Sequence, residues 1–148
     1  MAEIQRLFLI DGSSYVFRAF YAIGQLSTSK GFPTNAIYGF TSMFLRVLRE
    51  MNPEYVAVVF DAKGPTFRDE IYSDYKANRP AMPQGLEPQI PYIKRIVEAY
   101  NIPAIEKEGY EADDVIGTIA KEAAKQGVDV SIVTGDKDML QLVDEHIR

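Results

Sequence analysis

The segment Leu7-Phe8-Leu9-Ile10-Asp11-Gly12 decides the fold. Four consecutive apolar residues followed by Asp-Gly are typical of a strand that is buried on both faces and ends in a tight turn. Strands of this kind belong to parallel sheets that carry helices on both sides. The residues that follow, 13–24, have apolar side chains at helical spacing, and Ser13 or Ser14 is the predicted N-cap of that helix.

The rest of the chain alternates between strand and helix patterns. Further strands are predicted over 55–60, 103–105 and 128–133, and further helices over 34–51, 86–100 and 111–126, with one more beginning at 139. This alternation predicts an α/β fold, namely a three-layer, mostly parallel sheet with helices on both faces, forming one domain over 1–148. The segment at about 62–84 contains three prolines and no sustained apolar face, so we expect a mobile loop with some helix there.

Composition excludes several classes of chemistry. The 148 residues include no cysteine and a single histidine, His146. Disulfides, thiolate zinc sites and histidine-rich metal sites are therefore excluded, and a Ser/His/Asp triad is disfavoured. No apolar run approaches the roughly 18 residues that span a bilayer, and no signal peptide is recognisable. We expect a cytoplasmic protein that does not bind membranes.

The negative charge is concentrated late in the chain. Residues 101–148 hold 11 acidic and 5 basic side chains, whereas residues 1–100 are nearly balanced, within a total charge of −5. An acidic protein binds nucleic acid poorly, because affinity for phosphates comes mainly from Lys and Arg. That objection fails if bound cations occupy the carboxylates.

Carboxylates follow three of the predicted strands and open one helix. Because ligands of open α/β sheets bind at the carboxyl ends of the strands, we expect these side chains to converge. Two carboxylates about 4 Å apart repel by roughly 4 kcal/mol at an effective dielectric of 20, and divalent cations remove that repulsion. Oxygen ligands favour Mg²⁺ or Mn²⁺, and two such ions catalyse phosphodiester hydrolysis. The candidate metal ligands are Asp11, Asp61, Glu111, Asp113, Asp114, Asp136 and Asp138.

Each group of carboxylates also has an ordinary structural explanation. Acidic residues in the first turn of a helix, such as those at 111–114, complement the helix dipole. Asp11 precedes glycine and suits a plain turn, while Asp136 and Asp138 suit a helix start. The coincidence of three acidic strand ends with one acidic helix start favours the metal site over these alternatives.

Basic and aromatic residues in the segment at 62–84 complement the acidic rim. Arg68 lies there, and the spacing Tyr75-Lys76-x-x-Arg79 places one ring and two cations near a single helical turn. Such a group is suited to holding the scissile phosphate, with a merely solvated loop as the alternative. Arg18, close after Asp11, is a candidate for a terminal phosphate, although an outward-facing helix arginine is the ordinary outcome.

Six motifs in order carry a family resemblance. They are Leu-Ile-Asp-Gly at 9–12, Val-Phe-Asp-Ala at 59–62, Thr-Phe-Arg at 66–68, Tyr-Lys-x-x-Arg at 75–79, Gly-Tyr-Glu-Ala-Asp-Asp at 109–114 and Thr-Gly-Asp-Lys-Asp at 134–138. Over essentially its whole length the chain resembles the amino-terminal 5′ nuclease domain of bacterial DNA polymerase I, in the flap endonuclease family with its PIN-like fold. The resemblance implies a gateway segment, including Tyr75, Lys76 and Arg79, that passes single-stranded 5′ ends. Arg18 and Arg68 are further candidates for DNA binding.

The resemblance also implies the metal assignments and the reaction. Asp11, Asp61, Glu111, Asp113 and Asp114 would surround a first Mg²⁺ or Mn²⁺ ion, and Asp136 and Asp138 would contribute to a second. Lys76 and Arg79 would assist catalysis. The expected activity is that of a 5′-3′ exonuclease or flap endonuclease acting on 5′ ends or flaps of DNA in replication and repair. A metal-activated water would attack phosphorus in line and leave a 5′-phosphate and a 3′-hydroxyl.

The chain departs from the family pattern at its end. The family completes its second metal site with further aspartates and grips duplex DNA through a helix–three-turn–helix, and this chain stops at Arg148 before either. We therefore expect a monomeric portion of a longer polypeptide whose second metal site is incomplete.

Three other functions compete with nuclease activity. The first is a catalytically inactive portion that binds DNA structures, because the second metal site lacks ligands. The second is a metal-dependent adhesion module, although Tyr15 breaks its Asp-x-Ser-x-Ser loop. The third, a dinucleotide enzyme, is disfavoured because no G-x-G-x-x-G follows the first strand.

Overall fold

A computed structural model describes residues 6–62, 84–135, 142–143 and 146–148 of the chain. Within these residues the strands form one parallel sheet in the order β3-β2-β1-β4. The strands are β1 (Arg6–Asp11), β2 (Tyr55–Val59), β3 (Ala104–Ile105) and β4 (Asp129–Val133). The predicted parallel α/β sheet is confirmed.

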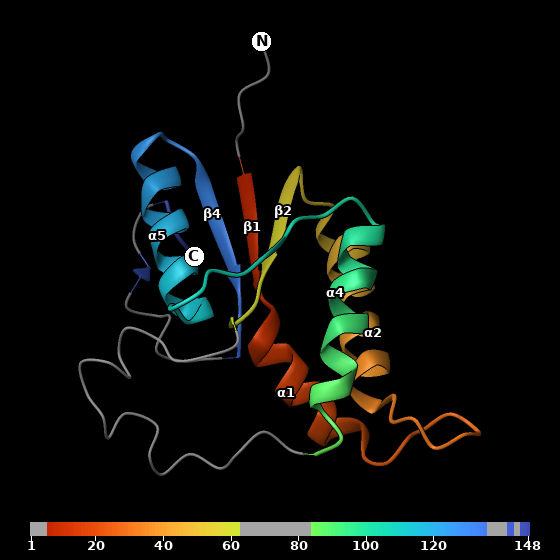
Figure 1. Ribbon diagram of the computed structural model, residues 1–148. Coiled ribbons are helices and arrows are strands. Elements are labelled where there is room, and N and C mark those ends of the chain that lie inside the picture. The colour runs from red at the N-terminus through yellow and green to blue at the C-terminus, as the bar shows by residue number, and fades with distance from the viewer. Residues whose placement is uncertain (1–5, 63–83, 136–141, 144–145) are drawn as a thin grey trace.

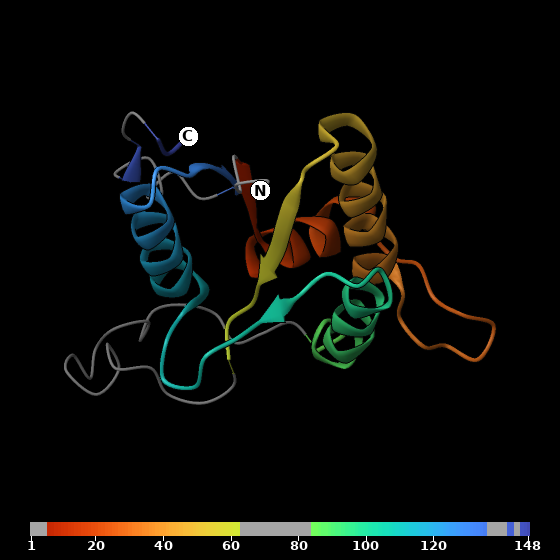
Figure 2. The same cartoon turned by 90° about the horizontal axis from the view of Figure 1, so that it is seen from above.

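Helices cover both faces of this sheet. They are α1 (Gly12–Ile23), α2 (Asn35–Met51), the short 3₁₀ helix η1 (Glu87–Gln89), α4 (Ile90–Ala99) and α5 (Ala112–Lys125). Figure 1 shows α5 against one face of the sheet and α2 with α4 on the other, and Figure 2 shows the same separation from above. The predicted three-layer arrangement is therefore confirmed.

Strand β1 contributes to the cores on both faces. Ile10 belongs to the cluster formed with α1, α2 and α4, where Phe40 and Phe44 stack with ring centroids 5.9 Å apart. Leu9 points the other way, into the cluster formed with α5. Both residues have no exposed surface. Because successive side chains of a strand alternate between faces, a strand buried on both sides must be apolar at consecutive positions.

The carboxyl ends of the three longer strands meet at one edge of the sheet. Asp11 pairs with Val59 of β2, and Ile10 pairs with Val133 of β4. The residues directly after each strand, including Asp61 and Thr134, therefore emerge beside Asp11. This edge lies where β1 passes into α1 in Figure 1.

Gly12 permits a close approach at this edge. A Cβ atom at residue 12 would lie 2.6 Å from Cε1 of Phe60 and 2.8 Å from Cγ1 of Val58. Real Cβ contacts are longer than this, so any larger residue would push β2 away from the start of α1. The glycine of the Asp-Gly pair thus serves packing between the first helix and the neighbouring strand.

Two local predictions were wrong in detail. The N-cap of α1 is Asp11, not Ser13 or Ser14, and its Oδ1 accepts a hydrogen bond of 3.2 Å from the backbone N–H of Ser14. The single helix predicted over 86–100 is divided into η1 and α4. Pro88 and Pro91 stand at the starts of these two elements, where the missing N–H of proline has no helical partner to lose.

Residues 146–148 extend the sheet beyond β4, which the sequence analysis did not predict. Val130 and Ile147 form a parallel bridge, and the N–H of Val130 donates to the carbonyl of His146 at 2.7 Å. Ile147 is completely buried in the α5 cluster. The chain therefore returns to the sheet after β4 and covers part of its edge.

A buried amide pair ties the second layer together. Gln89, with no exposed surface, donates from Nε2 to Oδ1 of Asn35 at 2.8 Å and accepts from the N–H of Ile37 at 3.0 Å. Asn35 in turn donates to the carbonyl of Phe20 at 2.8 Å. These bonds join the start of α4 to the start of α2 and to α1, and each buried polar group named here is satisfied.

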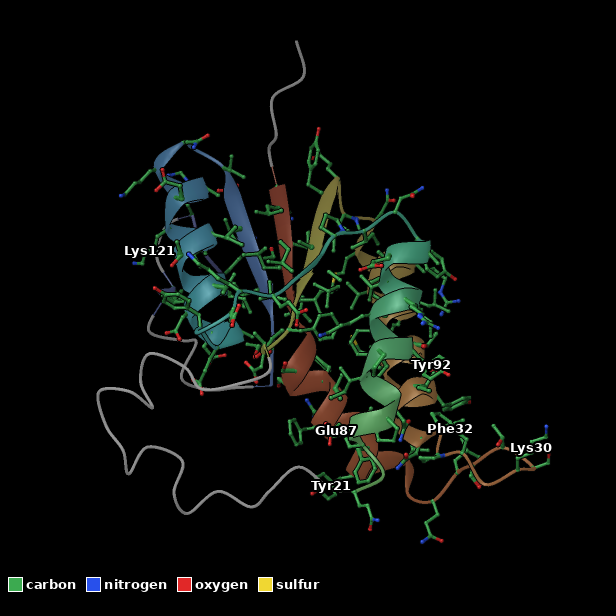
Figure 3. All side chains as sticks on the ribbon, in the orientation of Figure 1. Tyr21, Lys30, Phe32, Glu87, Tyr92 and Lys121 are labelled. Carbon is green, nitrogen blue, oxygen red and sulfur yellow. The ribbon has the colours of Figure 1, made fainter. Side chains whose placement is uncertain are left out.

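The connection between α1 and α2 projects from the body of the protein as a narrow loop. Ser27 and Pro33 form an antiparallel bridge across it, and Phe32 packs edge-on against Tyr92 of α4 with ring centroids 5.5 Å apart. Figure 3 shows Phe32 beside Tyr92 and Lys30 at the far end of the loop. In the part of the chain described, no helix is long and apolar enough to cross a bilayer.

Candidate metal centre at the carboxyl end of the sheet

Asp11 lies at the centre of the candidate site. Its side chain is buried, with 2% of the residue exposed. Oδ1 accepts the hydrogen bond from the N–H of Ser14, and Oδ2 accepts one of 2.8 Å from the hydroxyl of Thr134. These two donors fix the direction of the carboxylate. A buried anion held in this way is suited to bind a cation.

Asp61 connects the end of β2 to the start of α5. Its carboxylate accepts a hydrogen bond of 2.6 Å from the N–H of Ala112, and its own N–H donates to the hydroxyl of Ser13 at 2.7 Å. The N-terminus of a helix attracts anions, because its first N–H groups point outward and the helix dipole is positive there. Asp61 is itself exposed, so the carboxylate lies at the mouth of the site.

Glu111 and Asp114 form a capping box at the start of α5. The Glu111 side chain accepts from the N–H of Asp114, and the N–H of Glu111 donates to Oδ2 of Asp114 at 3.3 Å. Glu111 is buried, with 6% exposed, and Asp114 is half-buried. The ordinary capping explanation thus describes two of the three acidic residues in this turn. Asp113, also half-buried, lies in the same turn outside the capping box.

Of the predicted carboxylates, those of Asp11, Asp61 and the first turn of α5 lie at one edge of the sheet. Hydrogen bonds link Asp11, Asp61 and the first turn of α5 through Ser13, Ser14 and Ala112. Among the residues described, no group of three carboxylates is close enough to hold one ion. The oxygen-only donor set nevertheless fits a hard divalent cation such as Mg²⁺.

Arg18 of α1 reaches the same edge. Its guanidinium NH1 lies 3.7 Å from the position that a Cβ atom of Gly135 would take, directly after β4. The side chain is exposed. Arg18 therefore lies over the carboxyl end of the sheet, where an anionic ligand of the site would be within its reach.

Several predicted site residues fall outside the described part of the chain. They are Asp136, Asp138, Arg68, Tyr75, Lys76 and Arg79, with the rest of the expected gateway segment at 63–83. Their assignments remain predictions.

Three hydroxyl residues at the site were missed as functional residues. Ser13 accepts from the N–H of Asp61, Ser14 accepts from the N–H of Gly135 at 3.1 Å, and Thr134 donates to Asp11. Ser13 and Ser14 follow Asp11 by two and three residues, and Thr134 stands directly after β4 at the start of the motif at 134–138. That position is the signal that could have indicated them, because hydroxyls at strand ends can bond to the backbone of the neighbouring strand.

Similar proteins match almost the whole of this chain. A family model described as the 5′-3′ exonuclease, N-terminal resolvase-like domain, matches residues 6–148. The 5′-3′ exonuclease of Aquifex aeolicus is 50% identical over 144 residues, covering 97% of this chain and 50% of that protein. DNA polymerase I of Caldicellulosiruptor bescii is 50% identical over 142 residues, covering 96% of this chain and 17% of the polymerase. The chain thus spans half or less of these relatives.

Solved structures share the fold. The T5 5′-exonuclease with bound divalent zinc ions has a TM-score of 0.71 at 22% identity, over 97% of this chain and 54% of the other. The T5 D15 flap endonuclease, in a pseudo-enzyme-product complex with DNA and metal ions, has a TM-score of 0.68 at 20% identity, over 97% and 53%. At this level of identity the likeness establishes the fold alone, which is the expected PIN-like one.

Proposed function

This chain belongs to the family of 5′-3′ exonuclease N-terminal resolvase-like domains, and from that premise we propose that it carries the metal centre of a 5′ nuclease. The substrate is DNA with a free 5′ end or a 5′ flap, and the reaction is hydrolysis of a phosphodiester bond. The relatives named for 5′-3′ exonuclease and DNA polymerase I activity support this choice of substrate.

The buried Asp11 carboxylate is the observation that carries the proposal. Burial of a carboxylate is costly unless it is hydrogen-bonded or paired with a cation. Here both oxygens are oriented by neutral donors at the edge where an α/β sheet binds its ligands.

The residues that would hold divalent ions are the carboxylates of this edge. We propose Mg²⁺ or Mn²⁺, with Asp11, Asp61, Asp113 and the capping pair Glu111 and Asp114 around the first ion. Asp136 and Asp138 are proposed for the second. When bound, such ions lower the pKa of a water and neutralise charge on the reacting phosphate oxygens.

The cationic residues have a complementary role. Arg18 lies over the site and is proposed to contact a phosphate at the 5′ end. Arg68, Tyr75, Lys76 and Arg79 are proposed to bind the single strand and, for Lys76 and Arg79, to hold the scissile phosphate. Lys76→Ala should then slow cleavage more than it weakens DNA binding, whereas a loss confined to affinity would make Lys76 an anchoring residue.

A 5′-flap substrate incubated with the protein in Mg²⁺ and in Ca²⁺ tests the proposal. We expect binding in both ions and products carrying a 5′-phosphate and a 3′-hydroxyl in Mg²⁺ alone. Asp11→Asn is the matched inactive variant. Binding without products in Mg²⁺ would favour the DNA-structure-binding alternative, which is motivated by the chain spanning half or less of its relatives. Absence of both binding and products would contradict the proposal itself.

A further inference from the structure

Two hydrogen bonds, both donated by residues that directly follow β4, join this strand to the start of α1. The hydroxyl of Thr134 donates to Oδ2 of Asp11 at 2.8 Å, and the N–H of Gly135 donates to the hydroxyl of Ser14 at 3.1 Å. Thr134 and Asp11 are 123 positions apart in the sequence. The proposed function uses the aspartates of the Thr-Gly-Asp-Lys-Asp motif and leaves its threonine without a role.

This arrangement holds the two oxygens of one carboxylate from two different elements. Oδ1 is bound by the backbone of α1 through Ser14, and Oδ2 is bound by Thr134 from β4. A carboxylate held at a single oxygen can still turn about its Cβ–Cγ bond, whereas one held at both oxygens cannot without breaking a bond. The Thr134 hydroxyl therefore selects one orientation of the Asp11 carboxylate.

We propose that Thr134 is a positioning residue, which orients Asp11 for the divalent cation through its hydroxyl group. The proposal rests on the proposed function, because it assumes that Asp11 is a metal ligand. Groups that orient metal ligands typically change metal affinity or activity by about 10- to 100-fold when they are removed. Thr134 acts through Asp11 and needs no contact of its own with the ion or the DNA.

Thr134→Val tests this role, because it removes the hydroxyl and keeps the shape of the side chain. In the full 148-residue chain we expect it to weaken Mn²⁺ binding by about 10- to 100-fold in calorimetric titration without DNA. Thr134→Ser, which keeps the hydroxyl, should bind Mn²⁺ like the wild type. Single-turnover cleavage in Mg²⁺ should slow in the valine variant and recover in the serine variant, with unchanged affinity for the flap substrate in Ca²⁺.

Thr118→Val is the matched control. The hydroxyl of Thr118 also donates a hydrogen bond, of 2.9 Å, to the backbone carbonyl of Asp114 within α5. This bond does not orient a carboxylate. This variant should bind Mn²⁺ normally. If Thr134→Val does not fold, Thr134→Ala removes the same hydroxyl without adding a methyl group in its place.

The outcomes distinguish a failure of the role proposed for Thr134 from a failure of the proposed metal centre. Normal Mn²⁺ affinity in folded Thr134→Val, with the wild type binding and cleaving, would overturn the role of Thr134 and leave the metal centre intact. Equal losses in the valine and serine variants would also overturn it, because the effect would not follow the hydroxyl. A wild type that binds no Mn²⁺ would remove the proposed function and this inference together.

Discussion

The carboxylates at the two ends of the sheet differ in burial and in the groups that contact them. At the amino end, Asp129 lies 3.2 Å from His146 Nδ1 and 4.0 Å from a guanidinium nitrogen of Arg148, and all three side chains are more than a third exposed. At the carboxyl end, Asp11 is buried and is held by the hydroxyl of Thr134 and the N–H of Ser14.

This difference distinguishes an exposed ion pair from a buried carboxylate whose orientation is fixed. Solvent screens the charges around Asp129, so their pairing contributes little beyond fixing the last residues against β4. The N–H of Ser14 and the hydroxyl of Thr134 instead orient the carboxylate of Asp11 inside the protein. An oriented, buried carboxylate at the edge where an α/β sheet binds its ligands is suited to a bound cation, and this connects the fold to the proposed metal chemistry.

The largest effect is expected from Asp11→Asn, which removes the charge at the carboxyl end. The amide oxygen can still cap α1, whereas Asp11→Ala would lose the cap seen here at a cost of about 1 kcal/mol. Loss of several kcal/mol of charge stabilisation corresponds to a fall in cleavage rate of about 10³-fold. Single-turnover rates on a 5′-flap substrate measure it, and an unchanged rate would remove Asp11 from the site.

Divalent cations should stabilise the folded protein. At 100 times the dissociation constant, a ligand of the native state adds about 2.7 kcal/mol. For a chain of this size that corresponds to a rise in melting temperature of about 5–10 °C. Thermal unfolding with and without Mg²⁺ or Mn²⁺ measures the shift, which Asp11→Asn should abolish. The same shift in Asp11→Asn would mean that the ion binds elsewhere and would break the contrast between the two ends.

Gly12→Ala should destabilise the carboxyl end directly. The added Cβ would overlap Phe60 and Val58, and overpacking of this kind typically costs about 1–3 kcal/mol. Gly117→Ala is the control, because its Cβ would meet only Leu142 at an ordinary 3.7 Å and a helix interior gains about 0.5–1 kcal/mol from alanine. Urea unfolding compares the two. A Gly12→Ala variant as stable to urea as the wild type would contradict the close approach described for Gly12.

The smallest effect is expected at the amino end. Asp129→Asn removes the partner of His146 and Arg148, and exposed ion pairs contribute less than about 1 kcal/mol. Cleavage and Mn²⁺ binding should both remain at wild-type levels. A large loss of cleavage or of Mn²⁺ binding would show that the two ends of the sheet are coupled.

Prediction from sequence succeeded where the deciding interactions are local. A buried face of a strand or helix gives a pattern of apolar residues that repeats along the chain. Such patterns are the apolar run before Asp11 and the helical periodicity over 34–51 and 111–126. The helix over 86–100 was placed correctly but its division was missed, because Pro88 and Pro91 act on individual turns. For the acidic turn at 111–114, the sequence left capping and metal binding open, and the structure supplies the capping box.

The amino-acid sequence alone determined the alternation of strands and helices and the placing of an aspartate at successive strand ends. Only the tertiary structure decided that Ser13, Ser14 and Thr134 bind across to neighbouring elements. Periodicity depends on residues a few positions apart. These hydrogen bonds join residues 48 to 123 positions apart, and they exist only because the register of three parallel strands brings those residues to one edge.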